Sequence, residues 1–423
     1  MTPHRRTTGR GAVDQNEDGM DRTVRNEALS RDFREELTGN ILPFWMTHVV
    51  DEERGVLHGA VGNDLRPVGG APRSAVLIAR VLWTFAAAHR RFGNPAYLAM
   101  ANRTLDELSR DFWDPVYGGL YWQIDRTGRP VSDRKHHYAQ AFGIYGLSEH
   151  HRTTGDPRSL DLARELFRKL EEHAFDRSGG GYIEGSARDW RPLEDRRLGP
   201  ADLDAPKSMN TMLHMIEAYT NLLRAWHDRT LAAQLGGLIR VFIERIVDVR
   251  AGHLGLFFDE QWRPLSESVS FGHDIEASWL LCEATDALDD RPLRESARRI
   301  SLRLADAVHR DGLGPKGSIL ADVSPVTPTD PLQQWWPQAE AIVGFYNAFQ
   351  LTGDERFERT ALRCWTYVKD HFVDREGGDW FKRLGPNGLP EPGGLKAGPW
   401  DCPYHHGRMC LEMIARLTER SQE

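Results

Sequence analysis

FWDPVYGGLYWQIDRTGRP, residues 112–130, is one of six similar segments that decide the fold of this 423-residue chain. Each segment places an aspartate shortly before one or more glycines. The aspartates, which recur at intervals of 63, 62, 72, 63 and 63 residues, are Asp51, Asp114, Asp176, Asp248, Asp311 and Asp374. In the quoted segment, the alternating residues 119–125 and the turn residues 126–129 predict a short hairpin. A period of this length indicates a repeat architecture of six units.

A second break falls in the middle of several units. The tetrapeptides FGNP (92–95) and TGDP (154–157) join a glycine that ends one helix to an Asn or Asp that caps the next. Each unit is therefore predicted to be a helix pair. The inner helices are expected near 73–92, 138–154, 207–226, 273–288, 336–352 and 405–419, with the outer helices between them. We predict an all-α fold, an (α/α)6 barrel, although the period alone also allows an open solenoid.

Composition limits the domain plan and the partners. Residues 1–24 are charged and aperiodic, which predicts a disordered extension before one catalytic barrel domain, 25–423. The net charge is 54 − 62 = −8 without a basic block, so nucleic acid is not an expected partner. The chain has no apolar run long enough for a membrane and no signal peptide. Four scattered cysteines favour the reducing cytoplasm. We expect a monomer or a weak dimer.

Polar and aromatic residues mark the start of every predicted inner helix, where aliphatic residues would be usual. The set is Arg80, Tyr138, Asn210, His214, Glu217, His273, Glu276, Trp335, Trp336, Glu340, Trp400, His405 and Arg408. All follow a hairpin, so we expect them at one end of the barrel. Aromatic rings beside Arg, His and Glu are typical of a saccharide site. Taken singly, each residue is equally compatible with a cap or a core position.

Other histidines carry no such pattern. Five of them lack a carboxylate at helical spacing and are predicted to lie on the surface: His136, His137, His150, His151 and His309. No metal-ligand spacing accompanies His273 and His405, so we expect neither a metal nor another cofactor.

At the starts of the last four inner helices the sequence resembles the cellobiose 2-epimerases of the N-acylglucosamine 2-epimerase superfamily. The motifs are KSMNTMLHMIEAYTN (207–221), FGHDIEASWLL (271–281), WWPQAEA (335–341) and KAGPWDCPYHHGRM (396–409). A looser match runs from about residue 30 to the C-terminus. The resemblance implies an (α/α)6 barrel and cofactor-free epimerisation at C2 of the reducing-end sugar of a β-1,4-linked disaccharide.

The resemblance also implies roles for individual residues. His273 and His405 are similar in place to the general acid/base pair, Arg80 to the residue that steadies the enediolate, and His214 to the ring-opening histidine. Glu276 and Glu340 look like supporting carboxylates, and Tyr138, Asn210, Trp335, Trp336 and Trp400 look like sugar-binding residues. Two positions depart from the motifs: Met212 stands where a histidine is common, and Asp401 stands where a lysine is usual.

These residue types suit the chemistry. Inversion at C2 needs ring opening, removal of the proton beside the C1 aldehyde and return of a proton to the other face, which two histidines can perform near neutral pH. The alternatives are a mannose 2-epimerase, a mannose/fructose aldose–ketose isomerase, an inverting glycoside hydrolase that uses Glu276 and Glu340, and a non-catalytic sugar-binding protein.

Overall fold

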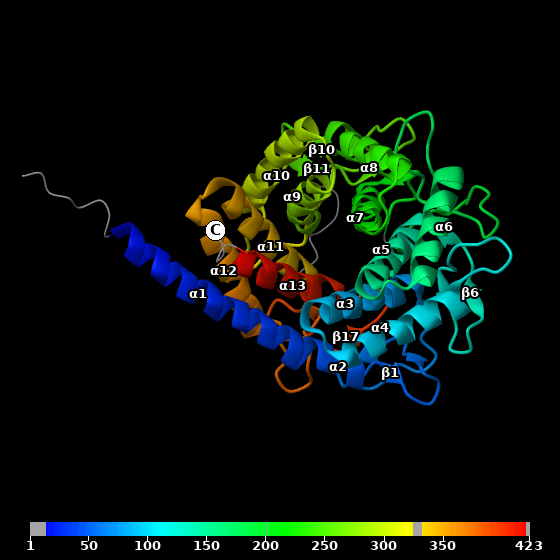
Figure 1. Cartoon of the computed structure of the whole chain (residues 1–423), viewed down its shortest axis with the longest axis horizontal. Coiled ribbons are helices and arrows are strands. Elements are labelled where there is room, and N and C mark those ends of the chain that lie inside the picture. The colour runs from blue at the N-terminus through cyan, green and yellow to red at the C-terminus, as the bar shows by residue number, and fades with distance from the viewer. Residues whose placement is uncertain (1–13, 201, 325–331, 420–423) are drawn as a thin grey trace, which may run out of the picture.

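Two concentric rings of helices form the protein in the computed structural model, which describes residues 14–200, 202–324 and 332–419 (Figure 1). The inner helices are α3 (Ala75–Phe92), α5 (His137–Thr154), α7 (Met209–Ala225), α9 (Phe271–Asp286), α11 (Trp335–Thr352) and α13 (Tyr404–Glu419). The outer helices are α1 (Asp14–Glu36) with α2 (Leu42–Thr47), α4 (Pro95–Glu107), α6 (Pro157–His173), α8 (Arg229–Val241), α10 (Arg291–Asp311) and α12 (Glu355–His371). The predicted all-α barrel is confirmed.

Short antiparallel strand pairs link each unit to the next. They are β4 (Arg73–Ser74) with β5 (Gln123–Ile124), β7 (Lys135–His136) with β8 (Gly185–Ser186), β9 (Lys207–Ser208) with β12 (Phe257–Phe258), β13 (Val269–Ser270) with β14 (Asp322–Val323), and β15 (Gln333–Gln334) with β16 (Arg383–Leu384). Local pairs join β1 (Val50–Asp51) to β2 (Val56–Leu57), and β10 (Val247–Asp248) to β11 (His253–Leu254). The predicted hairpin is present, with β5 paired to β6 (Pro130–Ser132).

A sixth link closes the ring. Strand β17 (Leu395–Ala397), just before α13, pairs with β3 (Val61–Gly62) near the start of the chain. In Figure 1 the red α13 lies beside the blue α1 and close to α3, and both contacts are present. The chain is therefore a closed barrel, and the open solenoid is excluded.

Capping residues at the helix junctions explain why the repeat could be read locally. Gly93, Gly155 and Gly353 end α3, α5 and α11 with φ of 69°, 74° and 73°, a left-handed conformation that favours glycine. Asn94 and Asp156 then cap the next helix by accepting a hydrogen bond from a backbone N–H two residues on.

The recurring aspartates brace the hairpin end. Oδ1 of Asp114 and Asp374 accepts backbone N–H groups of the following turn. Their other oxygen accepts from a lysine that precedes an inner helix: Lys135 at 3.1 Å and Lys396 at 2.6 Å. Both ammonium groups are fully buried, so these pairs fasten the hairpins to the inner ring.

The expected disordered extension is corrected for residues 14–24, which belong to α1, while residues 1–13 lie outside the described part of the chain. This helix is polar, and contacts with its neighbours hold it. Arg25 pairs with the buried Glu358 of α12 at 2.6 Å, and the Arg22 guanidinium lies over the Phe349 ring.

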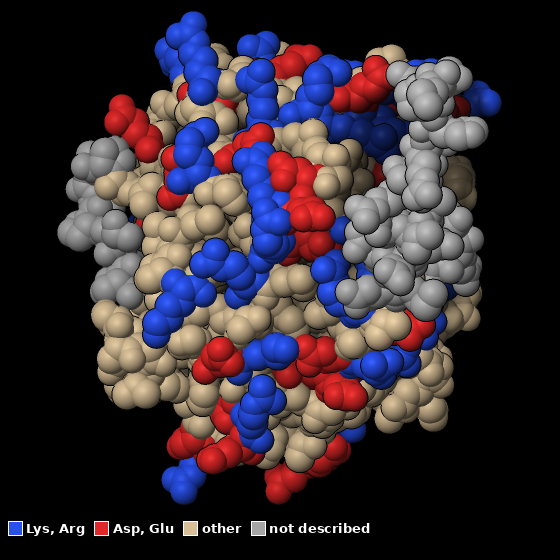
Figure 2. Space-filling view, turned by 90° about the vertical axis from the view of Figure 1, so that its left-hand side faces the viewer, with Lys and Arg blue, Asp and Glu red and all other residues tan. Residues whose placement is uncertain are grey.

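The molecular surface shown in Figure 2 carries interspersed acidic and basic side chains, without a continuous basic area on the part that is coloured. In the described residues no helix combines the length and the apolar character needed to cross a bilayer.

Candidate active site

A cavity of about 230 Å³ lies at the hairpin end of the inner ring. Ten of the eleven predicted site residues line it: Arg80, Tyr138, Asn210, His214, His273, Glu276, Trp335, Trp336, Trp400 and His405. The eleventh, Glu340, does not line the cavity and instead contacts His405. An adjoining cavity of about 420 Å³ shares Asn210 and His273 with the first. The structure thus brings the predicted set together from all six inner units.

Two imidazoles contact one indole in this cavity. The ring centroid of Trp336 lies 4.7 Å from that of His273 and 5.5 Å from that of His405. Nδ1 of His273 lies 2.7 Å from the Ser270 hydroxyl. Nδ1 of His405 lies 2.7 Å from Oε1 of Glu340, which accepts its proton. With Nδ1 occupied in both rings, Nε2 is the nitrogen available for chemistry.

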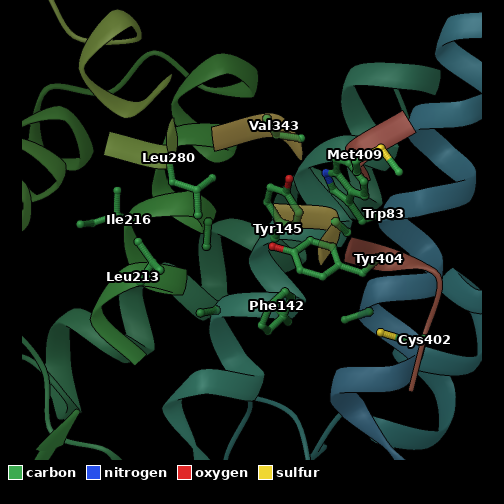
Figure 3. Close-up of a cluster of buried hydrophobic side chains, with 14 of the residues drawn as sticks. Trp83, Phe142, Tyr145, Leu213, Ile216, Leu280, Val343, Cys402, Tyr404 and Met409 are labelled. Atoms are coloured by element: carbon green, nitrogen blue, oxygen red, sulfur yellow. The ribbon is translucent and has the colours of Figure 1, made fainter. Parts of the chain in front are cut away.

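A third histidine belongs to a separate acidic contact. Nδ1 of His214 lies 3.0 Å from Oε2 of Glu217, one helical turn further along α7. The Tyr404 hydroxyl donates to the same carboxylate, 2.5 Å from each oxygen. Figure 3 shows Tyr404 between Phe142 and Tyr145, which place the phenol edge-on to both rings. Packing and hydrogen bonding therefore fix the carboxylate that orients His214.

Arg408 connects three carboxylates beneath the cavity. Its Nη1 donates to Glu217, and its Nη2 donates to Oε1 of Glu276 at 2.6 Å and of Glu340 at 2.8 Å. Its guanidinium also lies over the Trp279 ring, whose Nε1 donates to Glu340 at 3.0 Å. All of these groups are buried, so one cation serves three acidic side chains.

Arg80 has different surroundings. Its Nη2 donates to the Tyr138 hydroxyl at 2.7 Å, and its Nη1 contacts the Cys402 thiol at 3.7 Å. The guanidinium lies 4.2 Å from the Phe142 ring centroid and 4.7 Å from that of Tyr404. The described residues provide it with no ion pair, and its Nε is buried without a partner. It is a buried cation whose charge is not neutralised by a neighbouring carboxylate.

The aromatic and amide residues shape the cavity wall. Trp336 is held by a hydrogen bond from Nε1 to the Gln334 side chain at 2.8 Å. Trp400 lies 5.9 Å from the Tyr138 ring, centroid to centroid. Oδ1 of Asn210 and Nε1 of Trp335 are buried without a partner in the described structure. Unpaired polar atoms in a cavity wall are positions where a hydroxylated ligand can supply the missing hydrogen bond.

Burial sets the protonation states. It lowers the pKa of His273 to about 4 and takes that of His405 well below its usual value, so both imidazoles are neutral at pH 7. Burial would raise the pKa of Glu217, but Arg408 and His214 hold it down at about 2. Burial and then the charge of Glu340 raise the pKa of Glu276, which therefore carries a proton at neutral pH.

One group of side chains has the composition of a metal site. Ligand atoms of Glu276, Glu340 and His405 lie within 4.8 Å of one another in the described structure. Arg408 Nη2 already donates to both carboxylates at Oε1. A metal ion would have to share these oxygens with the guanidinium, and like charges repel, so the donor set does not fit a resident cation.

Sequence reasoning left several contact residues out of the site. Glu217 and Arg408 were recognised as polar residues at helix starts, but their bonds to His214, Glu276 and Glu340 were not predicted. Tyr404 and Cys402 gave no signal of their own. The i, i+3 spacing of His214 and Glu217 in the motif was the one local indication available.

Comparisons with known proteins agree with this geometry. The family model for N-acylglucosamine 2-epimerase matches residues 58–407. A cellobiose 2-epimerase from Bacteroides fragilis is 42% identical over 390 residues, covering 92% of this chain and 99% of the relative. The solved structure of the cellobiose 2-epimerase from Bacillus thermoamylovorans B4167 superposes with a TM-score of 0.87 at 38% identity, covering 92% of this chain and all of the other.

A more distant relative, a D-mannose isomerase from Thermobifida fusca, is 26% identical and covers 77% of this chain and 80% of its own. The enzyme class predicted from the sequence, a sugar isomerase that acts as a 2-epimerase, is confirmed by the family model and by the relatives with the higher identities. The chain belongs to the N-acylglucosamine 2-epimerase family.

Proposed function

We propose that this protein inverts C2 of the reducing-end sugar of a β-1,4-linked disaccharide, with cellobiose as the first substrate to test. The observation that carries the proposal is the pair of neutral imidazoles, His273 and His405, which both contact Trp336 in a cavity that also holds Arg80. The substrate class follows from the relatives of 42% and 38% identity that are named cellobiose 2-epimerases.

Ring opening comes first. The Nδ1–H of His214 donates a hydrogen bond to Glu217, so Nε2 can accept the proton of the C1 hydroxyl while the C1–O5 bond breaks, and can then deliver that proton to O5. Burial lowers the pKa of His214 to about 4, so this nitrogen is unprotonated at neutral pH. The aldehyde formed in this way makes the C2 proton acidic.

Proton transfer at C2 then uses the two imidazoles. The Glu340 carboxylate holds the Nδ1 proton of His405, so Nε2 of His405 acts as a base. The Ser270 hydroxyl donates to Nδ1 of His273, so this ring carries its proton on Nε2 and delivers it to the opposite face of C2, after which exchange with solvent restores both imidazoles. The proton carried by Glu276, whose Oε2 has no partner in the described structure, provides a donor beside His405.

Arg80 stabilises the enediolate in this scheme. Negative charge develops on O1 and O2 when the C2 proton leaves, and a fixed guanidinium in a site shielded from water stabilises that charge strongly. Because Arg80 contacts a phenol, a thiol and aromatic rings instead of a carboxylate, its charge remains available for the substrate.

The test follows proton exchange at C2. EDTA-treated protein is incubated separately with cellobiose, mannobiose and mannose in D2O, and NMR follows deuterium at C2 and the products. We expect the C2 epimer of the disaccharide with deuterium at C2. His273→Ala and His405→Ala should abolish exchange, whereas the matched control His309→Ala, on the outer helix α10, should retain it. An active His405→Ala protein would overturn the two-histidine scheme.

The mannose arm tests the second candidate, which the D-mannose isomerase relative favours. Epimerisation and aldose–ketose isomerisation share the enediol, and a ketose as the main product would identify the isomerase. An inverting hydrolase is disfavoured by geometry. The Glu276 and Glu340 oxygens that face each other lie within 4.8 Å, whereas inverting enzymes separate their carboxyl groups by about 6.5–9.5 Å.

A further inference from the structure

The two departures from the family motifs occupy very different places. Met212 is fully buried, and its sulfur packs against the hairpin glycine Gly181, away from both cavities. Asp401 lines the same cavity as His273 and His405. Of the two, only Asp401 is placed to touch a substrate.

The carboxylate of Asp401 is half-buried and unpaired. Neither of its oxygens makes a hydrogen bond or an ion pair with a described residue, although its backbone carbonyl accepts the Gly398 N–H at 2.9 Å. The neighbouring ammonium of Lys382 is committed to Asp379 at 2.9 Å. Because no described residue occupies these oxygens, the carboxylate is available to accept hydrogen bonds from the hydroxyl groups of a ligand in the cavity.

Asp401 belongs to the outer layer of the cavity. Arg80 and His214 lie more than one turn into α3 and α7, whereas His273 and His405 lie in the first turn of α9 and α13. Asp401 precedes the first residue of α13, and the lining residues Gln334 and Arg383 lie in strands β15 and β16. A sugar whose O1 and O2 lie against Arg80 and His214, the deeper groups of the cavity, therefore extends toward the outer segment that holds Asp401.

We propose that Asp401 is a specificity-determining residue that accepts hydrogen bonds from hydroxyls of the distal sugar unit, beside the Trp400 ring. The carboxylate then favours a disaccharide with a neutral distal ring over a monosaccharide and over a distal ring that carries its own carboxylate. This inference rests on the proposed function, because it takes the reacting sugar to be the reducing-end unit.

The substitution Asp401→Asn keeps the shape and removes the charge. Measured at pH 7.5, above the pKa of about 6 to which burial raises this carboxyl, the variant should show a KM for cellobiose raised about tenfold or more with kcat unchanged. KM for mannose should change less than twofold. The control Glu376→Gln removes an exposed carboxylate that lines neither cavity, and should behave like the wild type.

A charged probe provides the second arm. Glucuronosyl-β-1,4-glucose carries a carboxylate on its distal ring, so the wild type should use it at least tenfold less well than cellobiose, and Asp401→Asn should narrow that ratio. An unchanged KM for cellobiose, an equal loss on mannose, or an unchanged ratio between the two disaccharides would each overturn the inference.

Failure of the proposed function is recognised separately. Cellobiitol has no C1 aldehyde and cannot react, so calorimetry measures its binding without turnover. If the wild type binds cellobiitol but epimerises no sugar, the proposed function fails while the inference is still tested by the affinity of Asp401→Asn for cellobiitol. Equal affinities of wild type and variant would refute the role of Asp401.

Discussion

Replacing Arg408 with methionine should destabilise the barrel more than most single substitutions. Methionine keeps much of the length of the side chain but removes the charge. In the wild type the guanidinium is 2% exposed and donates to Glu217, Glu276 and Glu340. Each of these carboxyl groups is itself buried, so none can turn to water when the cation is gone.

The magnitude follows from the unpaired charge. Removing one partner of a buried ion pair costs about 3–5 kcal/mol because the other charge remains buried. Glu276 holds a proton at neutral pH and adds little to the stability lost in Arg408→Met. Glu217, with its pKa of about 2, is fully ionised and contributes most to that loss. We therefore expect a loss of about 3–5 kcal/mol at pH 7.5. Arg408→Lys keeps the charge but loses contacts, and should cost about 1.5–3 kcal/mol.

Glu217 determines the direction in which folding stability changes with pH. Its pKa is depressed from 4.5 to about 2 in the folded wild type, so its stabilising contribution is present above about pH 4.5 and is lost as the pH falls toward 2. In Arg408→Met, burial raises that pKa, so the ionised carboxylate costs stability above pH 4.5. The difference in the free energy of unfolding between the wild type and Arg408→Met is therefore largest at neutral pH and becomes smaller on acidification.

Urea unfolding followed by circular dichroism at pH 7.5 and 4.0 measures this difference in the free energy of unfolding. Arg359→Met on the outer helix α12 is the control, because the Arg359 side chain is 66% exposed and pairs with the equally exposed Glu355 at 3.2 Å, so the substitution should cost no more than about 1 kcal/mol. If Arg408→Met loses less than about 1 kcal/mol of unfolding free energy relative to the wild type, or loses the same amount at both pH values, the proposed role of the Arg408 charge is refuted.

Three further outcomes are expected. Arg80→Met should lower kcat about a hundredfold or more while unfolding at the wild-type urea concentration, since no carboxylate loses a partner. Below pH 7, kcat for C2 exchange at saturating cellobiose should fall only as the pH drops toward about 4, where His273 and His214 become protonated, and a kcat profile that breaks near 6.5 would contradict this. Lys396→Met should destabilise the barrel by about 3–5 kcal/mol in urea unfolding, because it leaves Asp374 of the closing unit unpaired.

The barrel could be predicted because its signals are local. The caps at Gly93–Asn94 and Gly155–Asp156 identify helix junctions from adjacent residues alone, and the inner helices begin and end within a few residues of the expected positions. Ring closure could not be predicted in this way. The pairing of β17 with β3 joins residues more than 300 positions apart, and no pattern in either strand indicates its partner.

Residues that depend on distant partners were predicted less well. His136, His137 and His150 were expected on the surface and are buried, because they bond to groups 9 to 60 residues away in sequence, such as the Ser159 hydroxyl at 2.8 Å from His150. Residues 14–24 were expected to be disordered, but they form the first part of the polar α1, where Arg22 lies 3.6 Å from Glu358 of α12. In each case tertiary contacts override a local pattern.

Two buried arginines show why the position of a charge matters more than its presence. Arg408 is surrounded by three carboxylates, so its charge is used within the protein and stabilises the ring of acidic groups behind His405. Arg80 has only aromatic rings, a phenol and a thiol around it, so its charge is compensated when a substrate oxygen becomes negative. A carboxylate beside Arg80 would make the resting protein more stable. It would also neutralise the guanidinium, which would then stabilise the enediolate less. The unpaired cation is therefore an arrangement that favours catalysis over stability.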